Sequence, residues 1–171
     1  LSAAMEEEVV NDAALASSQE QANTFWALRE GVPEAMIRHY ERRWMAFDIA
    51  VPIGLIDRFV REVDLAISAR WGDVDTLLFG HVGDGNLHLN FAKREPDATE
   101  VFNARKEEIT RLAYELTTAN AGSINAEHGV GQDKRDLLPN HVDEAHMTLM
   151  RKVKAALDPR EILNPGKLLA A

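Results

Sequence analysis

The residues with the clearest chemical potential lie in "GHVGDGNLHLNF", residues 80–91, where His81 and His88 flank a glycine-rich turn. Asp-Gly favours a two-residue hairpin turn, because both central positions of that turn require positive φ. With Asp84 and Gly85 at those positions, the two histidines become direct cross-strand partners whose Cβ atoms lie roughly 5 Å apart. The sequence therefore predicts two adjacent imidazoles on one face of a hairpin.

Two imidazoles this close suit a bound metal ion or a shared proton, because two imidazolium ions would repel each other. A metal site needs further ligands, usually including a carboxylate. Glu127, in the segment "AEHGVG", is the best candidate, and it is followed directly by His128. Spacing alone also fits an ordinary hairpin whose histidines are hydrogen-bonded and hold no ion.

Arg29 is the second unusual residue, because it shares a helical face with Phe25. Ser18 is expected to cap this helix, which runs to about Glu30. Arg29 then leans toward the side expected to be buried. A guanidinium group there can bind a carboxylate through two hydrogen bonds. The alternative is a structural arginine whose head reaches solvent.

Hydrophobic periodicity predicts an α+β fold, with an antiparallel or mixed sheet covered on one face by helices. The expected helices cover residues 18–30, 33–43, 52–71, 97–122 and 140–157. The expected strands cover residues 45–52, 75–82 and 86–91, and residues 122–131 are expected to form a strand that leads into a glycine-rich loop. The hairpin is expected to bury Leu78, Val82, Leu87, Leu89 and Phe91, and the last helix Val142, Leu149 and Val153. His39, His141 and His146 are expected to be solvated.

Composition limits the classes of partner. The 171 residues carry a formal net charge of −9 and no cysteine. We therefore expect no nucleic-acid partner, no membrane span and a reducing, cytoplasmic location. The chain begins with leucine, and we expect it to be one domain, residues 1–171, of a longer protein.

Five segments together resemble the C-terminal domain of FAD-linked 2-hydroxy-acid dehydrogenases and oxidases, in the vanillyl-alcohol oxidase superfamily. The segments are "FWALRE", "FDIAVP", "GHVGDGNLHLN", "EHGVG" and "DPREILNPGK". D-lactate dehydrogenase, the glycolate oxidase flavin subunit and D-2-hydroxyglutarate dehydrogenase are members of this group. The resemblance implies a domain that carries much of the substrate site, while FAD binds mainly to an N-terminal domain absent from these residues.

The resemblance also implies a role for each matching residue. His81, His88 and Glu127 would hold a divalent ion, most simply zinc, with manganese or iron as alternatives. His128 would be the catalytic base, while Arg29 and Asn90 would contact the substrate. Asn164 and Lys167, in "NPGK", would lie near the flavin.

The implied partners are a small 2-hydroxy acid, the FAD domain of the same chain and an electron acceptor, with a homodimer as a further expectation. Ala46 departs from the pattern of D-2-hydroxyglutarate dehydrogenases, which place a lysine at the matching position. The choice among 2-hydroxy acids therefore stays open. Two other classes of protein are alternatives: a metal-binding or structural domain without catalysis, and a metal-dependent hydrolase.

We predict that Arg29→Lys in the full-length protein weakens recognition of the substrate. Lysine keeps the charge and loses the two-pronged hydrogen bonding of arginine. The loss in kcat/KM should correspond to roughly 1.5–3 kcal/mol, the range for a hydrogen bond to a charged group. Steady-state kinetics of the two proteins provide the measurement, and unchanged kinetics would return Arg29 to a structural role.

Overall fold

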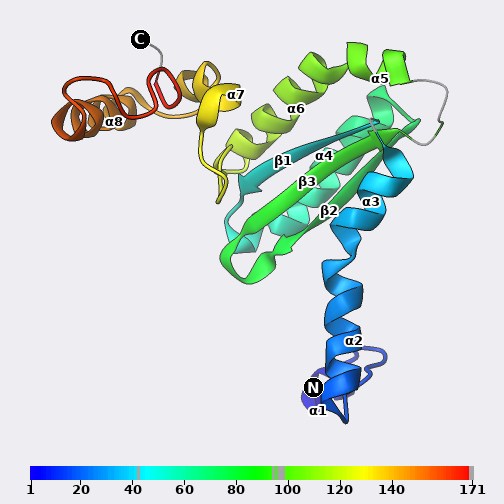
Figure 1. Cartoon of the computed structure of the whole chain (residues 1–171). Helices are drawn as coiled ribbons and strands as arrows, with labels where there is room; N and C mark the ends of the chain where they lie inside the picture. The colour runs from blue at the N-terminus through cyan, green and yellow to red at the C-terminus, as the bar shows by residue number, and fades with distance from the viewer. Residues whose placement is uncertain (42, 94, 96–98, 170–171) are drawn as a thin grey trace. The chain divides into compact units, whose positions relative to one another are not determined.

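The chain divides into two units, Leu1–Glu41 and Arg42–Ala171, in the computed structural model of the protein (Figure 1). The structure describes residues 1–41, 43–93, 95 and 99–169. The expectation of a single domain stays a prediction.

The first unit consists of α1 (Ser2–Glu6), α2 (Gln19–Glu30) and α3 (Val32–Tyr40). Ser18 caps α2 as predicted, since its side-chain oxygen accepts a hydrogen bond from the backbone N–H of Gln21. No residue of α2 is buried, so the expectation that Arg29 leans toward a buried side is wrong. The apolar residues of α2 are exposed in this unit, Phe25 at 43%, Trp26 at 55% and Leu28 at 71%.

A three-stranded antiparallel sheet organises the second unit. It is formed by β1 (Trp44–Ala50), β2 (Val74–His81) and β3 (Asn86–Lys93), in the order β1-β3-β2. Helix α4 (Ile56–Arg70) lies against β2, and α6 (Lys106–Ala119) lies against β1 (Figure 1). The α+β prediction is confirmed.

The core lies between this sheet and the two helices. Alternate residues of the strands are buried on one face, and they meet the apolar stripe of α4. The strands contribute Phe47, Ile49, Leu87, Leu89 and Phe91, and the helices contribute Phe59, Val63, Ile67, Ile109 and Ala113. This packing leaves the opposite face of the sheet for polar side chains.

The register of the hairpin differs from the prediction. His81 pairs with Asn86, and His88 pairs with Phe79, so the two histidines are not direct partners. The turn is longer than two residues, because Val82–Asp84 forms a short 3-10 helix. Gly85 alone supplies the left-handed conformation, with φ of 78°.

Two local contacts explain this longer turn. The side chain of Asp84 accepts a hydrogen bond from Asn86 N at 3.2 Å, an arrangement that favours a turn over a tight hairpin. The carbonyl of Gly85 also accepts from Val51 N, and a Cβ at residue 85 would lie 2.3 Å from Val51 O. Val82 consequently lies in the turn with 52% of its surface exposed, and its predicted burial is wrong.

The segment 122–131 is not the predicted strand. It makes one isolated bridge, between Ser123 and Ala50, and then bends. The backbone N–H groups of residues 126–128 instead donate to the side chain of Asp48. Short elements follow: α7 (Gly131–Arg135) and a 3-10 turn (Leu138–Asn140).

Two predicted helices also differ in detail. The helix expected over 97–122 is interrupted, with α5 at Thr99–Ala104 before α6, and its expected start at Asp97 lies outside the described residues. Helix α8 (Glu144–Leu157) buries Met147, whereas Leu149 and Val153 are exposed rather than inward-facing.

His141 is not solvated as expected. It is half-buried, its Nδ1 lies 2.8 Å from Thr118 Oγ1, and its ring meets that of Tyr114 edge-on. His39 and His146 are exposed. Among the described residues, no helix is both long and apolar enough to cross a membrane.

We predict that Leu89→Ala lowers the free energy of unfolding by about 2–5 kcal/mol, because it opens a cavity at a fully buried position of the central strand. Leu65→Ala on α4 is the matched control, since Leu65 is 70% exposed and its loss should cost no more than about 0.5 kcal/mol. Urea denaturation of the two variants measures the difference. Equal losses would contradict the assigned packing of β3.

We also predict an acid-sensitive contribution from Asp73. The ammonium group of Lys93 and the guanidinium group of Arg105 lower the pKa of Asp73 below its usual value of 3.8. The stabilisation is therefore complete above about pH 4 and is lost as the pH falls below that value. The difference in unfolding free energy between the wild-type protein and Asp73→Asn should shrink from pH 7 to about pH 3. A difference that stays constant over this range would contradict the prediction.

Candidate metal and catalytic site

The polar face of the sheet carries the candidate site. Asp48, His88 and Phe79 are aligned across β1, β3 and β2, because the register pairs each with the next. His81 lies two residues beyond Phe79 and therefore on the same face. The rings of His81 and His88 are 6.3 Å apart, so the predicted shared face is correct although the direct pairing is not.

Glu127 lies among three imidazoles. Its Oε1 is 3.4 Å from His88 Nε2 and 3.6 Å from His128 Nε2. Its Oε2 is 3.9 Å from His81 Nδ1. The ring of His128 stacks on that of His88 with centroids 5.7 Å apart. The fold therefore gathers the four residues predicted as metal ligands and catalytic base.

A set of side chains that overlaps with these four fits a divalent cation. Asp48, His88, Glu127 and His128 each offer one ligand atom within 4.8 Å of the others. Imidazole nitrogens together with carboxylate oxygens suit zinc, and also manganese or iron. His81, a predicted ligand, lies outside this tighter set but within reach of Glu127. The ligand assignment stays a prediction.

Asp48 was not predicted as a site residue, although it anchors the loop that bears Glu127 and His128. Its Oδ2 accepts hydrogen bonds from the backbone N–H groups of Ala126, Glu127 and His128, at 3.1, 3.0 and 2.9 Å. Burial raises the pKa of Asp48, but the three amides outweigh burial and bring its pKa below the usual value. The sequence held one signal: a charged residue between Phe47 and Ile49, in the middle of an apolar strand.

Lys134 is a second residue that sequence reasoning missed. Its ammonium group donates to the carbonyl of Asp48 at 3.0 Å and to Asn125 Oδ1 at 3.3 Å. It also lies 4.0 Å from Asp48 Oδ2. Burial lowers the pKa of Lys134, while the charge of Asp48 opposes that shift. Lys134 therefore links α7 to β1 and to the 125–128 loop, the two segments that carry Asp48 and Glu127.

Asn90, predicted to contact substrate, lies beside His88 on β3 and is 1% exposed. Its side-chain amide donates to the carbonyl of His88 at 2.9 Å and to that of Leu77 at 3.4 Å. It is paired with Ala46 across the sheet. Asn90 thus borders the cluster along the polar face, and its role in binding substrate stays a prediction.

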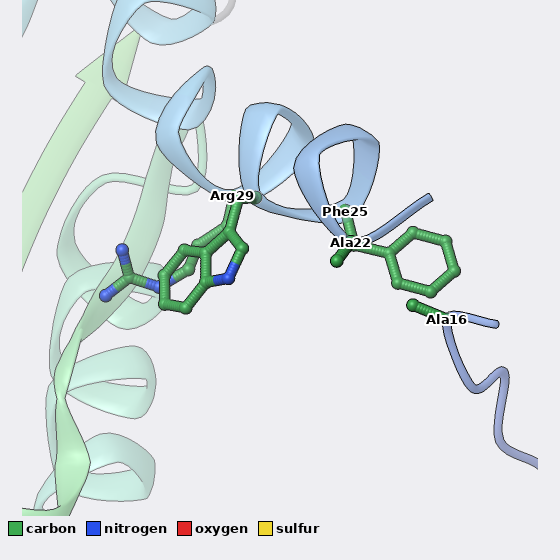
Figure 2. Close-up of a pocket in the computed structure, with 5 residues that line it drawn as sticks. Ala16, Ala22, Phe25 and Arg29 are labelled. Atoms are coloured by element: carbon green, nitrogen blue, oxygen red, sulfur yellow. The ribbon is translucent and has the colours of Figure 1, made fainter. Parts of the chain in front are cut away.

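Arg29 lies in the first unit, whereas the cluster lies in the second. Its guanidinium carbon is 5.1 Å from the centroid of the Trp26 ring, a cation–π contact. An apolar hollow beside it is lined by Ala16, Ala22 and Phe25 (Figure 2). The side chain is exposed, so it is accessible to a carboxylate, and its role as a clamp stays a prediction.

Asn164 and Lys167 lie in the tail that follows α8. Both are exposed, and Lys167 N donates to the Asn164 carbonyl at 3.2 Å. Asn164 has φ of 48°, and the neighbouring Gly166 carbonyl accepts from Arg135 Nη1 at 2.7 Å. The tail is therefore a folded turn joined to α7, and its predicted contact with flavin stays a prediction.

Comparison with known proteins adds an independent observation. Residues 1–168 match the family model described as "FAD linked oxidases, C-terminal domain". D-2-hydroxyglutarate dehydrogenase of Stutzerimonas stutzeri is 37% identical over 95% of this chain and 34% of the relative. The protein of the same name from Xanthomonas citri is 39% identical over 96% of this chain and 34% of the relative.

A mammalian relative is also matched over only part of its length. The mitochondrial D-2-hydroxyglutarate dehydrogenase of Bos taurus is 35% identical over 94% of this chain and 28% of the relative. The chain thus spans about a third of the length of the curated relatives it matches. The match to the family model over nearly the whole chain, together with these identities, shows that the chain belongs to the family of FAD-linked oxidase C-terminal domains.

Proposed function

We propose that this chain is the substrate- and metal-binding part of an FAD-dependent oxidoreductase that oxidises a 2-hydroxy acid to the 2-oxo acid. The observation that carries the proposal is the convergence of Glu127 on His81, His88 and His128 in a member of this family. D-2-hydroxyglutarate is the first substrate to test, because the relatives are named for it. D-lactate and glycolate are the alternatives, because Ala46 offers no cation for a second carboxylate.

In this proposal the residues of the chain divide the work of binding and proton transfer. Arg29 binds the carboxylate of the substrate through two charge-assisted hydrogen bonds. Asn90 orients the substrate from the sheet. His128 accepts the proton of the C2 hydroxyl as general base.

Two bound groups complete the site. His81, His88 and Glu127 would hold a divalent ion, which supplies stabilisation of the developing alkoxide when bound. FAD, held mainly by another domain and bordered by Asn164 and Lys167, supplies a two-electron acceptor for the C2 hydride when bound. Loss of one proton and one hydride from the substrate balances the oxidation of the alcohol to the ketone.

Exposure supports the choice of His128 as the base. Its side chain is 65% exposed, whereas that of His88 is 22% exposed, so an incoming hydroxyl group reaches His128 more easily. The electron acceptor, the homodimer and the cytoplasmic location remain predictions of the sequence. The bovine relative is named as mitochondrial.

We predict that Glu127 and His128 do different jobs in the full-length protein. Glu127→Gln should lower metal affinity by about tenfold or more, by analogy with the loss of the less direct outer partners of metal ligands. His128→Ala should keep the metal and lower turnover by about 100-fold or more, the usual contribution of a general base. His146→Ala, on the exposed surface of α8, is the control and should change neither quantity.

Metal content and turnover are measured side by side for these variants. Loss of metal in His128→Ala with retention in Glu127→Gln would show that the two roles are exchanged. Hydrolysis of an ester by the wild-type protein, without oxidation of any 2-hydroxy acid, would favour the hydrolase alternative instead.

A further inference from the structure

The carboxylate of Asp48 is unusual because its two oxygens face different parts of the site. Oδ2 accepts the three backbone N–H groups of the 126–128 segment, all within 3.1 Å. These residues lie nearly 80 positions from Asp48 in the sequence and contain no regular secondary structure. A segment whose backbone makes no helix or strand hydrogen bonds is normally mobile, and its amide hydrogens exchange readily with water.

The second oxygen, Oδ1, is buried and has no hydrogen-bond partner in the described part of the chain. It lies 4.0 Å from Nδ1 of His88, whose other nitrogen, Nε2, faces Glu127 at 3.4 Å. A small rotation of the imidazole would bring Nδ1–H onto Oδ1. A histidine that donates one ring N–H to a carboxylate presents its other nitrogen, unprotonated, to a metal ion.

We propose that Asp48 is a positioning residue that sets the geometry of the site through both oxygens, holding the Glu127–His128 loop with Oδ2 and orienting His88 with Oδ1. The inference rests on the proposed function, because Asp48 positions the residues that are proposed to bind the metal ion and accept the proton. Its geometry rests on Asp48 of β1, His88 of β3 and the backbone of residues 126–128.

The burial and the hydrogen bonds of Asp48 favour this positioning role over direct binding of a metal ion. The side chain of Asp48 is 3% exposed, and Oδ2 already accepts three hydrogen bonds. A fourth contact at that oxygen would have to displace an amide, and Oδ1 faces Nδ1 of His88 at 4.0 Å, whereas it is Nε2 of His88 that faces Glu127. Lys134, 4.0 Å from Oδ2 and bonded to the Asp48 carbonyl, supplies the opposite charge that a buried carboxylate requires.

The position of Asp48 explains how adjacent residues can serve one site. In an extended strand, neighbouring side chains point to opposite faces. Because the N–H groups of Glu127 and His128 converge on one oxygen, the backbone is bent there, and both side chains reach the same cluster. Asp48 thus enforces the bend that the proposed division of labour needs.

The test combines amide exchange with Zn²⁺ binding in the full-length protein freed of metal. Asp48→Asn keeps the size of the side chain and removes its charge. We expect the amides of residues 126–128 to exchange at least about tenfold faster in this variant, as expected for lost bonds to a charged group. We expect Zn²⁺ affinity to fall about 10–100-fold, the range for outer partners of metal ligands.

Asp73→Asn is the matched control, because it likewise replaces a paired carboxylate of the same unit, here a half-buried one, by an amide. It should leave Zn²⁺ affinity and exchange at 126–128 within about twofold of the wild-type values, since Asp73 is bonded to Lys93 and Arg105 and not to the loop. A fall in Zn²⁺ affinity in Asp48→Asn but not in Asp73→Asn therefore cannot be explained by general destabilisation.

The wild-type protein provides a measurement that does not depend on a stable variant. Its amides at 126–128 should exchange more slowly than that of Gly129, which follows the bonded segment. Equal exchange at 126–129 would overturn the proposal, as would Zn²⁺ affinity unchanged in Asp48→Asn. A fall in affinity without faster exchange would also overturn it, because Asp48 would then act as a ligand rather than through the loop.

These outcomes can be separated from failure of the proposed function, since neither readout uses turnover. If the full-length protein oxidises no 2-hydroxy acid, the proposed function fails. The exchange and Zn²⁺ results would still decide the role of Asp48.

Discussion

The contact between the Asp48 carboxylate and the 126–128 backbone connects the two parts of the candidate site. The sheet alone can place His81 and His88, because both lie on its strands. Glu127 and His128 come from an irregular segment far along the chain, and one buried carboxylate brings them to the sheet. A charge-assisted hydrogen bond is stronger than a neutral one, and three of them at one oxygen are a firm anchor for a loop.

The sheet is suited to this arrangement because one face carries apolar side chains and the other carries polar side chains. Phe47, Leu87 and Leu89 close the core on one face with essentially no exposed surface. The alternate positions are then free to carry polar groups, since side chains of a strand point to opposite sides in turn. Asp48 and His88 can therefore be held rigidly by a hydrophobic core that they do not enter.

Much of this could be predicted from the sequence, because periodicity is a local property. The alternating strands, the apolar stripe of α4 and the cap at Ser18 follow from such local patterns. The hairpin was placed on the correct face but in the wrong register, since an Asp-Gly pair does not reveal that Asp84 bonds to Asn86 or that Gly85 meets Val51. The error was two residues, so it preserved the alternation and the shared face of the histidines.

The remaining features depend on contacts between distant residues, which a single sequence does not display. The 122–131 segment resembles a strand in composition, yet only Ser123 bonds to a strand, and the amides of residues 126–128 are satisfied by the side chain of Asp48. Lys134 and Asp48 were overlooked for the same reason, because each acts through a partner far along the chain. The exposed surface of α2 likewise depends on what surrounds it and not on its own periodicity.

We propose that the histidine–carboxylate cluster serves flavin-linked oxidation of a 2-hydroxy acid. The most direct measurement is anaerobic bleaching of flavin absorbance in the full-length protein after mixing with 2-hydroxy acids, each as separate enantiomers where the acid is chiral. We predict rapid bleaching by one enantiomer of a chiral acid, which slows strongly when a chelator removes the metal and recovers when a divalent metal is returned. No bleaching by any 2-hydroxy acid would show that the cluster does not serve this oxidation, and bleaching at the same rate without metal would show that the reaction needs no metal ion.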